Sequence, residues 1–285
     1  MKDIYHMLGL SRQNVSQCLQ RVCAKTLAAE VVVSFAKEIR KEHGKMGCRK
    51  MYWKAFADLP FGRDQCEQIL LSKGFRIEYP QNYRRTTYGI GKLYYPNRIE
   101  GLIVEGINQV WQTDITYIEV GDRFYYLVFI VDVYSRRIVG WSVDYSLWAQ
   151  ANIRALGKAI RLRGDGQLKG LIHHSDRGGQ YIDREYISCL AQQHITPSMC
   201  QFAWQNAYCE RVNGIIKNEY LKCWKLSNMV ELKKAVSRAV YLYNFERPHW
   251  KLPNKLAPVI FEKQVSEGLF RIKPTMKLYS NKLDT

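Results

Sequence analysis

Three acidic residues of the chain stand where a carboxylate would be expected to bind a metal ion. Asp114 lies inside a β-branched stretch, where an ionised side chain is costly unless it is paired or bound to a cation. Asp176 follows an apolar stretch and precedes Gly178 and Gly179, which allow a sharp turn. Glu210 stands near the start of a predicted helix. Three oxygen donors suit Mg²⁺ or Mn²⁺ rather than zinc.

Taken singly, each acid also has an ordinary structural explanation. Asp114 could be an edge or bulge residue, Asp176 a turn former and Glu210 a partner for the dipole at a helix start. The combination indicates more, because Asp114 and Asp176 would meet at one end of a sheet if their two strands were neighbours. A helix carrying Glu210 could then close the site.

The hydrophobic pattern of the second half predicts the elements that position these acids. Strands are predicted at 110–120, 124–134 and 137–145, close enough together for an antiparallel meander. A helix at 148–163 leads to a fourth strand at 168–174, and further helices are predicted at 182–193, 206–224 and 229–245. This order predicts an α/β fold, a mixed sheet with helices on both faces, over a core domain at 109–250.

The first 75 residues are predicted to form small helical modules that bind DNA. Residues 2–22 indicate two short helices broken at Gly9, with Ser11 capping the second, a helix-turn-helix pattern in which Arg12 could face DNA. Further helices are predicted at 28–44, 46–59 and 63–73. Residues 76–108 are predicted to be a basic linker. Its Arg84 and Arg85 alternate with tyrosines, which suits phosphate contact and base stacking, or ordinary packing.

The positive charge of the 285-residue chain favours a polyanionic binding partner over the alternative that the charge serves solubility alone. The formal net charge is +17, distributed as +8 over residues 1–108, +3 over 109–225 and +6 over 226–285. Basic arms around a nearly neutral middle suit double-stranded DNA, and 251–285 is predicted to be a basic C-terminal tail. No 18-residue apolar run and no signal-peptide pattern is present, so we expect no membrane contact and a cytoplasmic, nucleoid-associated protein. The eight cysteines lack zinc-site spacing.

The sequence around the three acids resembles a known family. The motifs are Asn108-Gln109-Val110-Trp111-Gln112-Thr113-Asp114-Ile115-Thr116-Tyr117, His174-Ser175-Asp176-Arg177-Gly178-Gly179-Gln180-Tyr181, Asn206-Ala207-Tyr208-Cys209-Glu210 and Tyr243-Asn244-Phe245-Glu246-Arg247-Pro248-His249. Together they resemble bacterial transposases of the insertion-sequence-three type, catalytic second-frame proteins with the Asp-Asp-Glu core of the retroviral-integrase superfamily. The resemblance covers roughly residues 31–261 and implies a ribonuclease H-like, five-stranded mixed sheet.

The resemblance implies a mechanism as well as a fold. Asp114, Asp176 and Glu210 would bind two Mg²⁺ or Mn²⁺ ions for cleavage and joining of DNA strands at the ends of a mobile element. Arg177, Arg211 and Lys217 are candidate contacts to DNA. The implied assembly is a homo-oligomer on DNA, with the possible addition of an upstream helix-turn-helix partner protein.

The chain departs from the family pattern at one loop. The spacing from Asp176 to Glu210 is about two residues short, and residues 200–205 read Cys-Gln-Phe-Ala-Trp-Gln where the family has a basic, glycine-containing loop. Asn206 is interpreted as the cap of the Glu210 helix.

Three alternative functions remain open from the sequence. One is a ribonuclease or junction-resolving nuclease on the same fold. Another is a catalytically inactive DNA-binding regulator derived from a transposase, which the presence of all three acids argues against and the short loop leaves open. The third is a non-haem iron site built from His174 and Asp176, which a β-barrel would favour and an α/β fold does not.

Overall fold

The computed structural model describes residues 7, 9, 11–59, 61–78, 92–164, 168–272 and 274–279. The chain divides into two compact units, residues 1–78 and 79–285, and each is described by itself. The predicted contacts Arg84 and Arg85 lie outside the described residues. Within the described ranges, no helix combines the length and the apolar character needed to cross a membrane.

The first unit is built on one long helix, α2 (Arg12–Glu42). The predicted cap is confirmed, because the backbone N–H of Asn14 donates to Ser11 Oγ at 3.0 Å. The prediction of separate helices at 11–22 and 28–44 is wrong. No glycine or proline interrupts α2, and residues 23–29 include Ala24, Leu27 and two further alanines, which are strong helix formers.

Three short helical segments fold back against the C-terminal half of α2. They are α3 (Cys48–Met51), the π-helical turn Tyr52–Phe56 and α4 (Arg63–Ser72). Their small shared core consists of buried Val32, Ala36, Ile39, Met46, Cys48, Met51, Phe56, Phe61, Cys66 and Leu70. The N-terminal half of α2 is exposed and contributes no buried residue.

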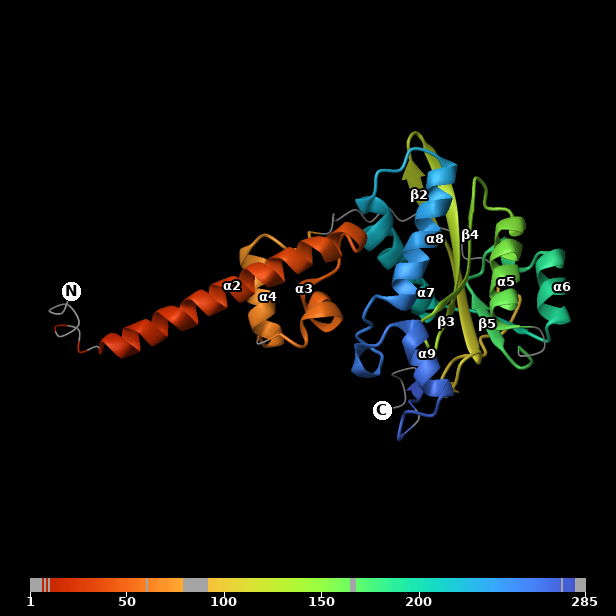
Figure 1. The fold of residues 1–285 in the computed structure, drawn as a ribbon. Helices are drawn as coiled ribbons and strands as arrows, with labels where there is room; N and C mark the ends of the chain where they lie inside the picture. Colours follow the sequence, from red (N-terminus) through yellow and green to blue (C-terminus); the bar gives the residue numbers. More distant parts are fainter. Residues whose placement is uncertain are drawn as a thin grey trace. The chain divides into compact units, whose positions relative to one another are not determined.

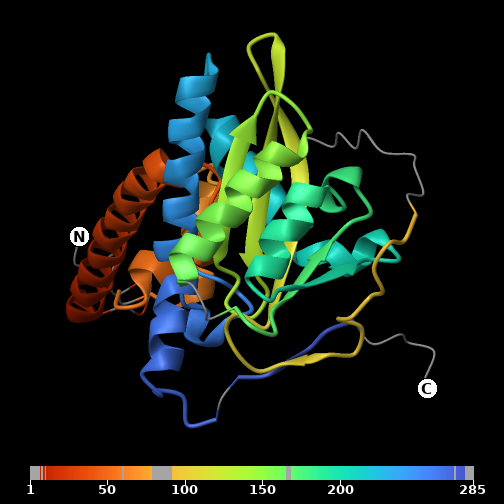
Figure 2. The ribbon, with the colours of Figure 1, turned by 90° about the vertical axis from the view of Figure 1, so that its right-hand side faces the viewer.

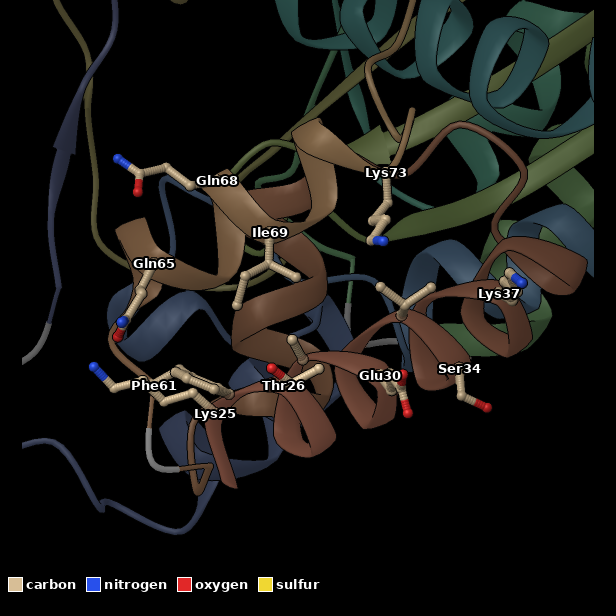
Figure 3. Close-up of a pocket in the computed structure, with 12 residues that line it drawn as sticks. Lys25, Thr26, Glu30, Ser34, Lys37, Phe61, Gln65, Gln68, Ile69 and Lys73 are labelled. Atoms are coloured by element: carbon tan, nitrogen blue, oxygen red, sulfur yellow. The ribbon is translucent and has the colours of Figure 1, made fainter. Parts of the chain in front are cut away.

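A groove of about 720 Å³ runs between α2 and α4 (Figure 3). Its lining combines aliphatic, amide and basic side chains: Lys25, Thr26, Ala29, Glu30, Val33, Ser34, Lys37, Phe61, Gln65, Gln68, Ile69 and Lys73. Three amines around one carboxylate give this groove a net positive charge.

The second unit contains a five-stranded sheet of order β4-β3-β2-β5-β6. Its strands are β2 (Val110–Val120), β3 (Arg123–Asp132), β4 (Ile138–Asp144), β5 (Ile172–Ser175) and β6 (Thr196–Met199). The first three are antiparallel, whereas β5 and β6 run parallel to β2. This mixed sheet confirms the ribonuclease H-like fold, and β6 is the strand whose position the sequence did not indicate.

Helices cover both faces of this sheet (Figures 1 and 2). On one face lie α7 (Ala207–Ile215) and α8 (Met229–Phe245), packed on inward side chains such as Leu127 and Phe129. On the other lie α5 (Ala149–Arg163) and α6 (Arg184–Gln192), packed on Val128 and Ile130. Because successive residues of β3 point to opposite faces, this one strand supplies both cores.

Two segments predicted to be a linker and a tail contain regular structure. Strand β1 (Ile103–Val104) pairs antiparallel with β7 (Met276–Lys277), and Figure 2 shows the pair at the lower edge of the view. Helix α9 (Pro258–Ser266) contributes buried Phe261 to a hydrophobic cluster that also contains Val104 of β1. The sequence did not predict these elements: the two-residue strands carry no periodicity of their own, and α9 lies in the segment predicted to be a basic tail.

Two polar side chains fasten α8 to the rest of the unit. The amide of Asn244 bonds both the N–H and the C=O of Ile138, each at 2.9 Å, at the start of β4. The guanidinium of Arg247 forms two 2.8 Å bonds to buried Glu219, in the π-helical turn Ile216–Tyr220 that follows α7. This part of the motif around 243–249 is therefore structural.

The packing of β4 on α5 depends on Gly140. A Cβ at this position would collide with the backbone carbonyl oxygen of Ala155 and touch Ala159 Cβ at 3.0 Å. We expect Gly140→Ala to lower the free energy of unfolding by about 1–3 kcal/mol, measured by urea denaturation. Gly157→Ala on the same helix is the control. Its Cβ would meet only Arg161 Nη1 at 3.4 Å, so we expect a gain of about 0.5–1 kcal/mol. Equal stability of Gly140→Ala and the wild type would contradict this packing.

Candidate active site

The register of two neighbouring strands brings Asp114 and Asp176 together. Strands β2 and β5 are parallel, and Gln112 pairs with His174. Each aspartate stands two residues beyond this pair and therefore on the same face and at the same level of the sheet. Strand β5 ends at Ser175, so Asp176 occupies its carboxyl end.

The Glu210 carboxylate reaches this face from α7, whose start is held by a side chain of β2. The fully buried Gln112 accepts at Oε1 from the backbone N–H groups of Tyr208 (3.1 Å) and Cys209 (3.4 Å). Its Nε2 donates to the carbonyl of Gln205 (2.9 Å) and to Tyr279 Oη (3.3 Å). Gln112 thus satisfies N–H groups that a helix start leaves unpaired, and it fixes Glu210 relative to Asp114.

Two asparagines complete the attachment of α7 to β2. The interpretation of Asn206 as a side-chain cap is wrong, because its side chain makes no cap hydrogen bond. Instead, Asn206 Nδ2 donates to the backbone carbonyl of Thr113 at 2.9 Å. Asn213, one turn after Glu210, donates from Nδ2 to Asp114 Oδ2 at 2.8 Å. Sequence reasoning missed the roles of Gln112, which lies within the first quoted motif, and of Asn213, which lies three residues after Glu210.

The charges of the three carboxylates act on one another. Burial first, then the carboxylates of Asp176 and Glu210, raise the pKa of Asp114 to about 8. Burial also raises the pKa of Asp176, against a hydrogen bond from Gly178 N–H that lowers it. Partial burial of the carboxylate and the charge of Asp176 raise the pKa of Glu210. Carboxylates whose charges raise the pKa of Asp114 and of Glu210 form a site in which a bound cation would favour the ionised forms.

The donor set suits a hard divalent cation, although no preformed cage is present. Within the described part of the chain, no three His, Cys, Asp or Glu side chains are grouped closely enough to hold a metal ion. All three converging groups are nevertheless carboxylates, the ligands that Mg²⁺ and Mn²⁺ prefer.

Of the six residues predicted to contact DNA, the structure brings two beside the carboxylates. Lys217 donates to Thr116 Oγ1 at 3.1 Å, and its pKa is lowered by burial and by Lys222 but raised by Asp114. Arg177, next to Asp176, donates to the backbone carbonyl of Cys200 at 3.0 Å and to that of Gln201. Arg211 is exposed on α7, and Arg12 is exposed at the start of α2 in the other unit.

The strand carrying Asp176 also contains two buried histidines. Burial first, then His174, lowers the pKa of His173 from 6.5 to about 3, and its Nε2 lies 2.6 Å from Tyr186 Oη. Burial lowers the pKa of His174 to about 4, and its Nδ1 lies 2.9 Å from Ser198 Oγ on β6. Both rings are therefore neutral in the folded protein at neutral pH.

The lowered pKa of His173 makes the fold sensitive to acid. In the unfolded chain His173 takes up a proton near pH 6.5, whereas in the folded protein its ring stays neutral at this pH. The contribution of neutral His173 to the free energy of unfolding is therefore present above this pH and is lost as the pH falls. Between pH 7.5 and 5.5, one such histidine costs about 1.4 kcal/mol. We therefore expect His173→Gln, which stays neutral, to lose about that much less stability than the wild type over this range in urea unfolding. Identical losses would show that His173 is protonated in the folded protein.

Comparison with known proteins places this arrangement in a family. Two models described as "Integrase core domain" match residues 105–203 and 192–256. The transposase for insertion sequence element IS904 of Lactococcus lactis is 31% identical over 202 residues, which are 68% of this chain and 76% of that protein. The transposase for insertion sequence IS3A of Escherichia coli is 29% identical over 142 residues, 49% of each chain.

A protein of insertion sequence element IS986/IS6110 from Mycobacterium tuberculosis is 36% identical over 148 residues. The match covers 49% of this chain and 52% of that relative, so the chain spans about half the length of this curated relative. A solved simian T-cell lymphotropic virus intasome in complex with a PP2A regulatory subunit superposes with a TM-score of 0.48 at 18% identity, over 81% of this chain and 74% of that chain. On the sequence matches, the chain belongs to the insertion-sequence transposases of the IS3 type, which have an integrase core.

Proposed function

We propose that this chain is a DNA transposase that cleaves DNA strands at the ends of a mobile element and joins them to target DNA. The observation that carries the proposal is the convergence of Asp114, Asp176 and Glu210 from two parallel neighbouring strands and the helix tied across them. Family membership supports phosphoryl transfer on DNA as the chemistry of these carboxylates.

Asp114, Asp176 and Glu210 are proposed to bind two Mg²⁺ or Mn²⁺ ions. When bound, these ions would activate the attacking hydroxyl and offset the negative charge that develops on the leaving 3′ oxygen. Burial and the charges of Asp176 and Glu210, which together raise the pKa of Asp114, favour this role, because a bound cation would stabilise the ionised carboxylate. No residue forms a covalent intermediate in this proposal.

The neighbouring side chains are proposed to position the carboxylates and the DNA phosphate. Asn213 holds the Oδ2 atom of Asp114 by a hydrogen bond and so orients this carboxylate. Lys217 lies along β2 beside Thr116, where its ammonium can contact the phosphate backbone. Arg211 and Arg177 are proposed as further phosphate contacts, with Arg177 also bracing the loop that begins at Cys200.

The first unit is proposed to bind DNA outside the active site. Its groove is lined by Lys25, Lys37 and Lys73 together with Glu30 (Figure 3). Exposed Arg12 begins the long helix. We also propose that Arg84 and Arg85 contact DNA, and that the domains have the limits predicted from the sequence. We further propose that the chain forms a homo-oligomer on DNA, because an enzyme that joins two element ends must hold both at once. An upstream helix-turn-helix partner protein is proposed as well.

The proposal is tested by cleavage and joining on a fluorescent duplex that carries the element's own ends, in Mg²⁺, Mn²⁺ or EDTA. We expect the wild type to nick and join only with metal. Asp114→Asn and Glu210→Gln should each lower the rate about 1000-fold or more while leaving duplex affinity within about twofold, because carboxylates that act as one unit fail together. Asp122→Asn, at an exposed turn between β2 and β3, is the matched control and should retain full activity.

Each other outcome identifies a different protein. Nicking without joining in either metal would favour a nuclease on this fold. Binding without nicking would favour a DNA-binding regulator. Undiminished activity of Asp114→Asn would reject the carboxylate site itself.

A further inference from the structure

Two aromatic rings lie exposed on the loop between β6 and α7. Phe202 is 57% exposed and Trp204 is 45% exposed. Their ring centroids are 6.1 Å apart and the planes differ by only 6°, so the two rings are nearly parallel. Large apolar side chains that stay in water are unfavourable by themselves, and a parallel pair offers a flat partner a broad π surface.

The loop adjoins the carboxylate site. Burial first, then the charges of Asp176 and Asp114, raise the pKa of the Cys200 thiol at its start to about 11. Arg177, the neighbour of Asp176, bonds the carbonyls of Cys200 and Gln201. At its other end the loop runs directly into α7, which carries Glu210.

The aromatic pair is held on a rigid support. Buried Gln205 accepts at Oε1 from the backbone N–H groups of Gln201 (2.7 Å) and Phe202 (3.1 Å), which closes the loop on itself. The Trp204 ring meets the Tyr279 ring edge-on, with centroids 5.6 Å apart, and Tyr279 Oη lies 3.3 Å from Gln112 Nε2. Gln112, which positions Glu210, therefore also supports the aromatic pair through Tyr279.

We propose that Phe202 and Trp204 form a stacking platform for an unpaired DNA base beside the phosphate that is cut. This inference rests on the proposed function and deepens it, because it identifies a distorted rather than a regular duplex as the bound substrate. The platform is a positioning device, and neither ring takes part in the chemistry.

Physical reasons favour a nucleobase as the occupant. Asp114 is partly covered, and drawing a phosphate out of the regular path of a duplex toward it would unstack a neighbouring base. An aromatic side chain replaces the lost stacking whatever the base, because every base has a π face. The net charge of +17 and the nearby Lys217 attract the strand that carries this base.

The test is binding in EDTA, so that it depends on neither metal nor cleavage. The probes are a fluorescent duplex of about 30 base pairs and the same duplex with a two-nucleotide mismatch containing 2-aminopurine. We expect the wild type to bind the mismatched duplex about fivefold or more tightly and to quench the 2-aminopurine. Phe202→Ala and Trp204→Ala should bring the affinity ratio close to one and restore the fluorescence. Trp204→Phe should retain most of the preference.

Trp250→Ala is the matched control, since Trp250 is 47% exposed but lies beyond α8. It should keep both the preference and the quenching. An unchanged preference for the mismatched duplex in both Phe202→Ala and Trp204→Ala would overturn the platform. So would a Trp204→Ala protein that loses its oligomers in sedimentation but keeps this preference. The latter would mean that the rings contact protein.

The failure of the platform and the failure of the proposed function are distinguishable. Asp114→Asn should keep the mismatch preference, because its aromatic loop is intact. A wild type that cleaves and joins DNA without any mismatch preference rejects the platform alone. A wild type that shows the preference in EDTA but never cleaves in Mg²⁺ or Mn²⁺ supports the platform and rejects the transposase activity.

Discussion

The side-chain amide of Gln112 joins four parts of the molecule that must keep their relative positions. It sits in the central strand β2, two residues before Asp114, and bonds the start of α7, the loop before it and Tyr279 near the C-terminus. A buried amide with both ends satisfied stabilises one arrangement, because any other leaves donors and acceptors unpaired away from water. The position of Glu210 relative to the aspartates therefore depends on this one side chain, with Asn206 and Asn213 as its supports.

The same arrangement holds together groups that repel one another. Burial and the charges of Asp176 and Glu210 raise the pKa of Asp114, and burial and Asp176 raise that of Glu210, so ionisation of this site costs the fold free energy. That cost is offset by the antiparallel pairing of β2 with β3, by the parallel register with β5 and by two hydrophobic cores on opposite faces of the sheet. Hydrogen bonds from Asn213 to Asp114 and from the Gly178 N–H to Asp176 favour the ionised carboxylates, and a bound divalent cation would favour them further.

Much of the sheet and the three acids could be predicted from the sequence. The bounds of β2 and α8 agree with the predicted 110–120 and 229–245, because long periodic segments carry a strong signal. Strand β6 was not located, since it is four residues long and contains Pro197, which is tolerated only because β6 is an edge strand. The two-residue pair β1 and β7 is defined solely by tertiary contact.

The partners of the acids were less accessible to sequence reasoning. Gln112 and Asn213 act across 93 and 99 residues of chain, so no local pattern reveals them. Asn206 has the residue type of a helix cap, yet its amide bonds β2 instead. The hydrogen bond to Thr113, which is distant in the sequence, determines the role of Asn206, and the residues next to Asn206 do not reveal this bond.

The most direct test of the central claim is the affinity for Mn²⁺, measured by water-proton relaxation without DNA. If Gln112 and Asn213 position the carboxylates, Gln112→Met and Asn213→Ala should each weaken Mn²⁺ binding about tenfold or more while keeping the wild-type circular dichroism spectrum. Asn213→Ala removes only a bond to Asp114 Oδ2, so it remains informative if Gln112→Met fails to fold. Mn²⁺ binding of wild-type strength in a folded Asn213→Ala or Gln112→Met protein would contradict the claim that these amides assemble the site.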